Sequence, residues 1–221
     1  MIRVWMSLFF LLATSGASLY AQPPESTLSS YESAKHELDS MKAHFVQKKI
    51  FTLFEETDTS EGEVWFKRPN QVLWRFQSPA LSDTILSGEN SWSVIPSTKQ
   101  VQKINVAGGN SNRLFEILGF GGGDEKLEDS FEVKEIPAAV DEKGMKLLSL
   151  IPKEESLKPY YSEIIVKLSV VDYLPRHVIL KEKSGDVTEI LLSDVESNIS
   201  VDNSLFEFKI PEGYQLIDYN Q

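Results

Sequence analysis

The sequence predicts a mainly β protein with added helices, in the α+β class, built around one curled sheet. Apolar and polar residues alternate in about ten or eleven short segments, most of them after residue 62, as expected of half-buried strands. Two other segments carry apolar residues at helical spacing. A sheet of this width tends to curl or close rather than stay flat. The helices are therefore expected to fill the mouth of a curled sheet.

The first helical segment is expected at about residues 25–49. Its apolar residues recur at spacings of three and four, and Ser26 or Thr27 can cap its start. The opposite face carries charged residues, which indicates a helix with one buried stripe. The apolar stripe consists of Leu28, Tyr31, Ala34, Leu38, Met41 and Phe45.

The clearest β signal is a hairpin with large apolar side chains on one face. Residues 62–67 and 72–76 alternate with a period of two, and Lys67–Arg68–Pro69–Asn70 forms the turn between them. Further strands are expected, as an antiparallel meander, at 83–86, 91–95, 100–106, 131–136, 145–152, 162–170, 176–182, 187–195 and 206–210.

The alternation is interrupted in the middle of the chain. Residues 111–118 are expected to form a short helix, which the glycine-rich run 119–123 ends, and 124–131 can form another helical turn. The apolar residues of the short helix are Leu114, Phe115, Ile117 and Leu118.

The N-terminus has the pattern of a secretory signal. Arg3 precedes a nearly continuous apolar run over residues 4–12, and small residues follow. We expect cleavage after Ala21, with Ala17 as an alternative site, so that 22–221 form a single domain; a retained N-terminal anchor is the other possibility. Removing Arg3 changes the formal charge from −11 to −11 − 1 = −12. Such an acidic protein is repelled by nucleic acid and by anionic headgroups.

The sequence shows no catalytic or metal-binding motif. The chain has no cysteine, which excludes a thiol nucleophile and a lipobox for lipid anchoring, and it has no G-x-S-x-G elbow. His36 and His44 lie about 80° out of alignment on the expected helix, and His177 is remote in sequence. The glycines of 119–123 lack the Lys-Ser/Thr of a phosphate loop. We therefore expect no enzyme, no cofactor and no metal.

A series of motifs resembles one known family over about residues 28–218. The family is that of the outer-membrane lipoprotein carrier proteins, LolA. The matching residues are Phe45-x-Gln47, Gly62, Val64-Trp65-Phe66-Lys67-Arg68-Pro69-Asn70, Trp74, Pro79, Asp83-x-Ile85, Gly88, Trp92-x-Val94 and Phe206-Glu207-Phe208-x-x-Pro211-x-Gly213.

The resemblance implies an unclosed antiparallel half-barrel with helical lids over a hydrophobic cavity. It also implies a monomeric periplasmic carrier of acylated lipoproteins, loaded by an ATP-driven transporter of the inner membrane and in many cases unloaded at an outer-membrane receptor. A carrier of another lipid and a periplasmic sensor of apolar ligands are the alternatives. In this family an arginine at the position of Arg68 holds the lid closed through bonds to lid backbone; the alternative is an exposed turn arginine.

The apolar face of the hairpin is the expected wall of the acyl-chain cavity, and the two helices are the expected lid. Part of each set can equally be ordinary dry core. The wall residues are Val64, Phe66, Val72, Trp74, Phe76, Leu86 and Trp92. The lid residues are Leu38, Met41, Phe45, Leu114, Phe115 and Leu118.

Overall fold

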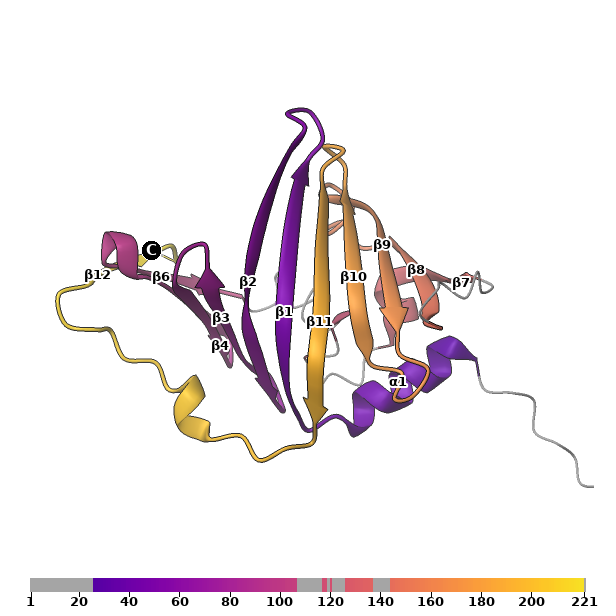
Figure 1. Ribbon diagram of the computed structural model, residues 1–221, viewed down its shortest axis with the longest axis horizontal. Helices are drawn as coiled ribbons and strands as arrows, with labels where there is room; N and C mark the ends of the chain where they lie inside the picture. Colours follow the sequence, from indigo (N-terminus) through magenta and orange to yellow (C-terminus); the bar gives the residue numbers. More distant parts are fainter. Residues whose placement is uncertain (1–25, 107–116, 119, 121–125, 137–143, 221) are drawn as a thin grey trace, which may run out of the picture.

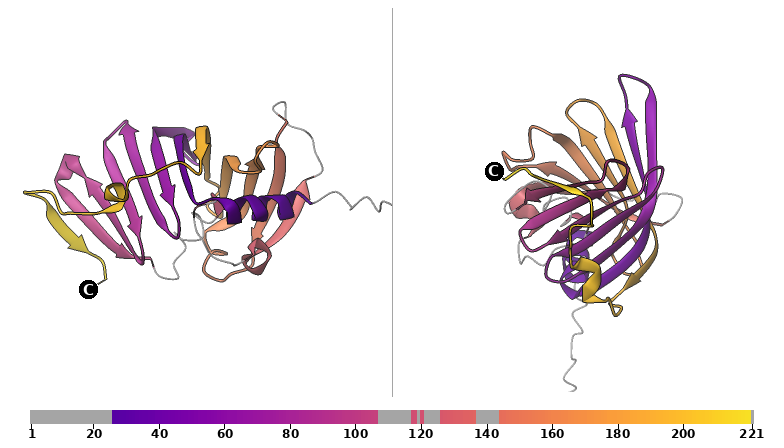
Figure 2. Two further views of the ribbon diagram at one scale, coloured as in Figure 1. Left: turned by 90° about the horizontal axis from the view of Figure 1, so that it is seen from below. Right: turned by 90° about the vertical axis from the view of Figure 1, so that its left-hand side faces the viewer.

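A computed structural model describes residues 26–106, 117–118, 120, 126–136 and 144–220. Within these residues the chain forms one sheet of twelve strands in the order β12-β6-β5-β4-β3-β2-β1-β11-β10-β9-β8-β7. The sheet is strongly curved and has two free edges, so it is an open half-barrel (Figure 1, Figure 2). The mainly β fold class predicted from the sequence is thus confirmed.

Sequential strands pair antiparallel along most of the sheet, and the last strand, β12, adds parallel to β6 at one edge. The strands are β1 (Ser40–Phe51), β2 (Glu56–Lys67), β3 (Gln71–Ser78), β4 (Ser82–Ser87), β5 (Asn90–Ile95), β6 (Gln100–Asn105), β7 (Phe131–Ile136), β8 (Lys146–Pro152), β9 (Tyr161–Leu168), β10 (Pro175–Glu182), β11 (Val187–Ser197) and β12 (Gln215–Asp218). The described helices are α1 (Thr27–Glu37), α3 (Leu127–Ser130) and the 3₁₀ turns η1 (Pro96–Thr98) and η2 (Asn203–Phe206).

The first helix is shorter than the sequence predicts. α1 begins after Ser26, whose side chain caps the backbone N–H of Ser29, and it ends at Glu37. The chain then enters β1, so the prediction of a helix as far as residue 49 is wrong. Met41 and Phe45 satisfy a helical stripe, but with the buried Ala43 they also satisfy a period of two. Pairing of β1 with β2 on one side and β11 on the other stabilises the strand.

The two faces of the sheet are buried in different ways. The inner face, which α1 covers, carries the main core, including Val64, Phe66, Val72 and Trp74. The outer face carries a smaller apolar cluster around Leu73 and Ile85. Adjacent residues of β2 and β3 therefore point to opposite faces, as the alternation predicts.

The C-terminal segment after β11 crosses the outer face before it joins β6 (Figure 1). The prediction of a strand at 206–210 is therefore wrong. Phe206 ends η2, and residues 207–210 follow it without strand pairing. Phe206 is instead part of the outer cluster, and Phe208 packs against it. We call residues 198–210 the C-terminal strap.

A bulge bends the hairpin formed by β2 and β3. Glu61 pairs with Ser78 while Gly62 pairs with Phe76, so Gln77 has no residue opposite it. A Cβ atom added at Gly62 would lie 1.9 Å from the backbone carbonyl oxygen of Arg75. This close approach of the two backbones explains the need for glycine at position 62. In the described part of the chain, no helix is long and apolar enough to cross a membrane.

Candidate functional site

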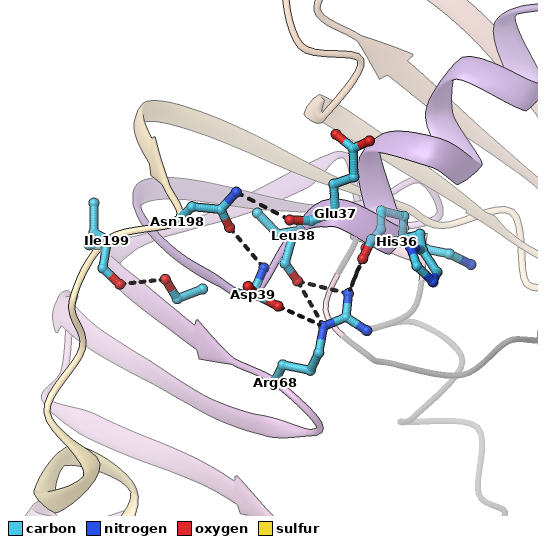
Figure 3. Close-up of polar contacts among 9 residues, drawn as sticks. His36, Glu37, Leu38, Asp39, Arg68, Asn198 and Ile199 are labelled. Atoms are coloured by element: carbon cyan, nitrogen blue, oxygen red, sulfur yellow. Dashed lines mark hydrogen bonds and ion pairs between the residues drawn. The ribbon is translucent and has the colours of Figure 1, made fainter.

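The C-terminal end of α1 is held by the side chain of Arg68 (Figure 3). The guanidinium Nη2 donates hydrogen bonds to the carbonyl oxygens of Lys35 (3.1 Å), His36 (2.8 Å) and Leu38 (2.9 Å), and Nε donates to Leu38 as well (3.2 Å). The last carbonyls of a helix have no partner within the helix, and the helix dipole favours a cation there. One arginine therefore bonds to three backbone acceptors at the helix end, of which the carbonyl of Lys35 also accepts the N–H of Leu38 (3.4 Å).

The position of Arg68 follows from the turn between β2 and β3. Its backbone N–H donates to the carbonyl of Asp39 (2.8 Å), which fixes the turn against the start of β1. The neighbouring Lys67 points to the other side of the sheet, where its Nζ donates to the carbonyl of Val201 (2.9 Å) in the C-terminal strap. The exposed carboxylate of Asp39 lies 3.4 Å from Nε of Arg68 and adds little at such exposure.

Asn198 is a second clamp on the same junction, and the sequence analysis missed it. Its side-chain oxygen accepts from the N–H of Asp39 (2.8 Å), and its amide donates to the carbonyl of Glu37 (3.2 Å) (Figure 3). Its own N–H donates to the carbonyl of Ser40 (2.7 Å). Asn198 adopts a left-handed φ of 54°, which asparagine tolerates better than most residues. In the sequence, an asparagine directly after a long predicted strand was the feature that could have indicated a turn at this position.

Contacts along α1 hold it across the β7 end of the sheet (Figure 2). The hydroxyl of the fully buried Tyr31 donates to the carbonyl of Ile117 (2.7 Å). The carboxylate of Glu32 accepts from the N–H of Leu127 (3.2 Å). These hydrogen bonds join elements that are far apart in sequence. The helix is thus tied along its length to the β7 end of the sheet.

Aromatic rings fill the inner face of β1, β2 and β3, beside the part of the sheet that α1 crosses. Phe45 lies against Trp74 and Phe76, with ring centroids 4.6 and 5.1 Å apart. Phe120 stacks on Phe66 at 5.6 Å and meets Trp74 edge-on at 6.2 Å. The sequence analysis attributed the run 119–123 to a helix stop and did not single out Phe120. An aromatic residue among glycines was the feature of the sequence that could have indicated a buried ring at position 120.

Six of the seven residues predicted to line the cavity wall belong to the inner core. Val64, Phe66, Val72, Trp74 and Leu86 are buried there and Phe76 packs against them. In the described structure they form packed core.

The prediction that Trp92 lines the cavity wall is wrong, because Trp92 lies on the outer face. It pairs with Ile85 of the outer cluster, and its ring stacks on Phe208 with centroids 5.5 Å apart. The two-residue turn Gly88–Glu89 sets this register, since it places Leu86 opposite Ser91 rather than opposite Trp92.

The predicted lid residues divide into three groups. Leu38 is the buried C-terminal cap of α1, and Leu118 is buried in the inner core. Met41 and Phe45 lie in β1, so their assignment to a helical lid is wrong; they belong to the sheet. Leu114 and Phe115 lie outside the described residues.

Charged groups with shifted pKa values lie away from the aromatic core. On the outer face, Lys181 donates to Glu163 (2.7 Å) and Ser149 donates to the same carboxylate (2.6 Å). The ammonium of Lys181, followed by the Ser149 hydroxyl, lowers the pKa of Glu163. Arg75 forms a bidentate pair with Asp83, which raises the arginine's pKa. In the described residues, no group of three or more His, Cys, Asp or Glu side chains could hold a metal ion.

The geometry is therefore suited to holding apolar material. The inner face offers aromatic and aliphatic side chains, and the helix is attached by its buried Tyr31 and Leu38 as well as by the hydrogen bonds of Arg68 to backbone carbonyls at its end.

Comparisons with known proteins point in the same direction. The family model described as outer membrane lipoprotein carrier protein LolA matches residues 36–209. An outer-membrane lipoprotein carrier protein of Alkalilimnicola ehrlichii is 26% identical over 182 residues, covering 82% of this chain and 79% of that protein. A protein of the same description from Azotobacter vinelandii is 26% identical over 219 residues, covering 96% and 99%.

The fold is also similar to that of a solved structure. An uncharacterized conserved protein from Thermus thermophilus aligns with a TM-score of 0.53 at 11% identity, over 87% of this chain and 96% of that one. This likeness concerns the fold alone.

Proposed function

The chain belongs to the LolA family of outer-membrane lipoprotein carrier proteins, and on this premise we propose that its inner face shelters lipoprotein acyl chains in transit. Members of this family are periplasmic transport proteins and not enzymes. The cargo would be received at the inner membrane and delivered to the outer membrane. We further propose that residues 1–21 are a signal peptide and that 22–221 form the carrier domain.

The observation that carries the proposal is a helix that Arg68 holds across one part of the inner face, beside the aromatic part. Arg68 bonds to three carbonyls at the end of α1, and Phe120 occupies the aromatic part. In our proposal α1 is a lid, Arg68 is its latch, and Phe120 holds the place that acyl chains take when the lid opens. Because the latch contacts backbone, opening removes hydrogen bonds without exposing a buried ion pair.

The energetics of the cargo require an apolar shelter. A triacylated lipoprotein carries roughly 45 methylene groups, and leaving them in water would cost on the order of 35 kcal/mol at about 0.8 kcal/mol each. Net binding free energies do not exceed about 21 kcal/mol. A carrier must therefore cover a large part of the chains and yet release them.

Release is helped by a lid that prefers to close. If closure is favoured by a few kcal/mol, cargo must supply that free energy to enter and recovers it on leaving. Arg68 then weakens apparent cargo affinity to a level at which an acceptor can compete. The partners in this scheme are an ATP-driven lipoprotein-releasing transporter in the inner membrane and a lipoprotein receptor in the outer membrane.

Photo-cross-linking from the two faces of the sheet tests the location of the cargo. Benzoylphenylalanine replaces Phe76 on the inner face in one variant and Trp92 on the outer face in the matched control. Each is loaded with a lipoprotein that carries radiolabelled acyl chains. We expect labelled adducts from position 76 and not from position 92. Equal labelling from both positions, or labelling from 92 alone, would contradict an inner-face site.

A further inference from the structure

The hairpin of β1 and β2 ends in two adjacent exposed apolar side chains. Leu53 is 84% exposed and Phe54 is 68% exposed. They lie in the turn between Phe51 and Glu56, which the N–H of Phe54 closes by donating to the carbonyl of Phe51 (3.1 Å). Leaving two such side chains side by side in water is unfavourable, and such groups on a protruding element mark contact sites.

The hairpin tip is held out from the molecule on a braced support. β1 and β2 are twelve residues each, and Figure 1 shows their turn reaching beyond the neighbouring strands. Thr52 is tied to the adjacent β10–β11 turn: its N–H donates to Asp186 (3.1 Å) and its hydroxyl to the carbonyl of Gly185 (2.7 Å). Lys49 also forms an ion pair with Glu182. The two apolar side chains are thus presented by a supported turn.

The charges around the tip distinguish between a lipid surface and a protein partner. Glu55, Glu56 and Asp58 lie within four residues after Phe54 and are exposed. On the preceding strand, Lys48 is exposed but Lys49 is paired with Glu182. An acidic flank is repelled by anionic headgroups, whereas it complements lysine and arginine around an apolar pocket. An aromatic anchor inside a charged rim is a common arrangement at protein interfaces.

The state of the latch indicates which partner meets the tip. Arg68 closes α1 at the other end of β1, and Leu53 and Phe54 are largely exposed in this closed arrangement. The partner that must recognise a closed carrier is the one that loads it. We infer that Leu53 and Phe54 dock into a basic-rimmed apolar pocket on the periplasmic face of the lipoprotein-releasing transporter. This inference rests on the proposed function.

Cross-linking from the tip tests this docking. Benzoylphenylalanine is placed at Phe54, and at Val171 in the matched control, since Val171 is 89% exposed in the turn between β9 and β10. Each protein is irradiated with vesicles of one lipid composition, with and without the reconstituted transporter. We expect adducts to a transporter subunit from position 54 and none from 171. Adducts from 54 to lipid in transporter-free vesicles, or none to the transporter, would overturn the inference.

A release assay separates this inference from the proposed function. In the same vesicles with ATP, the Leu53→Ser/Phe54→Ser double variant should release lipoprotein at least tenfold more slowly than the unchanged protein at limiting carrier concentration. Val171→Ser should release it normally. Equal rates for the double variant and the unchanged protein overturn the docking surface. If the unchanged protein itself releases no lipoprotein, the proposed function fails, and the cross-link from position 54 still decides for or against the surface.

Discussion

Replacing Arg68 by leucine should uncouple the loading of cargo from its release. The change removes donors from three carbonyl oxygens at the end of α1, those of Lys35, His36 and Leu38. The arginine side chain is 28% exposed, so a net value of about 1 kcal/mol for each acceptor is appropriate. The closed state would lose about 3 kcal/mol, which corresponds to a shift of roughly 150-fold towards the open state.

Because closure opposes cargo binding, the same shift should raise the apparent affinity for cargo. Arg68→Leu should therefore accept lipoprotein at least as well as the unchanged protein but donate it to outer membranes more slowly. The assay loads both proteins with a tagged lipoprotein, adds washed outer membranes and follows the tag from supernatant to membrane. Hydrogen exchange of the α1 amides gives an independent measure and should become faster.

Two further variants define what the latch requires. Arg68→Lys keeps the charge but lacks the planar fork, so its release rate should lie between those of the other two proteins. Arg75→Leu is the matched control, since Arg75 pairs with Asp83 on the outer face and makes no contact with α1 among the contacts described. Normal transfer by Arg68→Leu, together with unchanged exchange in α1, would refute the latch.

Three other changes test the support of the site. Asn198→Gly keeps the left-handed backbone but removes two hydrogen bonds, so thermal unfolding should show a loss of about 1–2 kcal/mol; an unchanged midpoint would contradict the second clamp. Gly62→Ala should prevent soluble expression, because its Cβ would lie 1.9 Å from a backbone oxygen, whereas Gly88→Ala, which has open space, should cost only about 1 kcal/mol. The pKa of Glu163 is lowered by Lys181, so its stabilising effect is present above about pH 4.3 and is lost as the pH falls through the folded-state pKa. Urea titrations between pH 6 and 3 should show a weaker pH dependence for Glu163→Gln than for the unchanged protein.

Local patterns predicted much of the sheet but not the end of the first helix. Most strands after residue 62 follow the alternation, because each has one face buried. At 38–45 the pattern is ambiguous, since Met41 and Phe45 suit both a helix and a strand. Pairing with β2 and β11 decides between them, and pairing depends on residues distant in sequence.

The candidate site shows the same limit. Arg68 was found through its motif, whereas its carbonyl partners depend on where α1 ends. Asn198 contacts Asp39 across 159 positions, which no local pattern records. Trp92 was assigned to the cavity wall together with Leu86, but the two-residue turn before β5 pairs Leu86 with Ser91, so Trp92 lies on the opposite face. Side-chain chemistry was thus easier to predict than the partner or face of each residue.

The central claim is that this protein carries lipoproteins through water between two membranes. The most direct measurement incubates residues 22–221 with spheroplasts that make a tagged outer-membrane lipoprotein, and then assays the supernatant, with a known carrier in parallel. We expect a soluble one-to-one complex that later donates its lipoprotein to outer membranes. Absence of lipoprotein from the supernatant, while the known carrier releases it, would show that this protein does not carry lipoproteins.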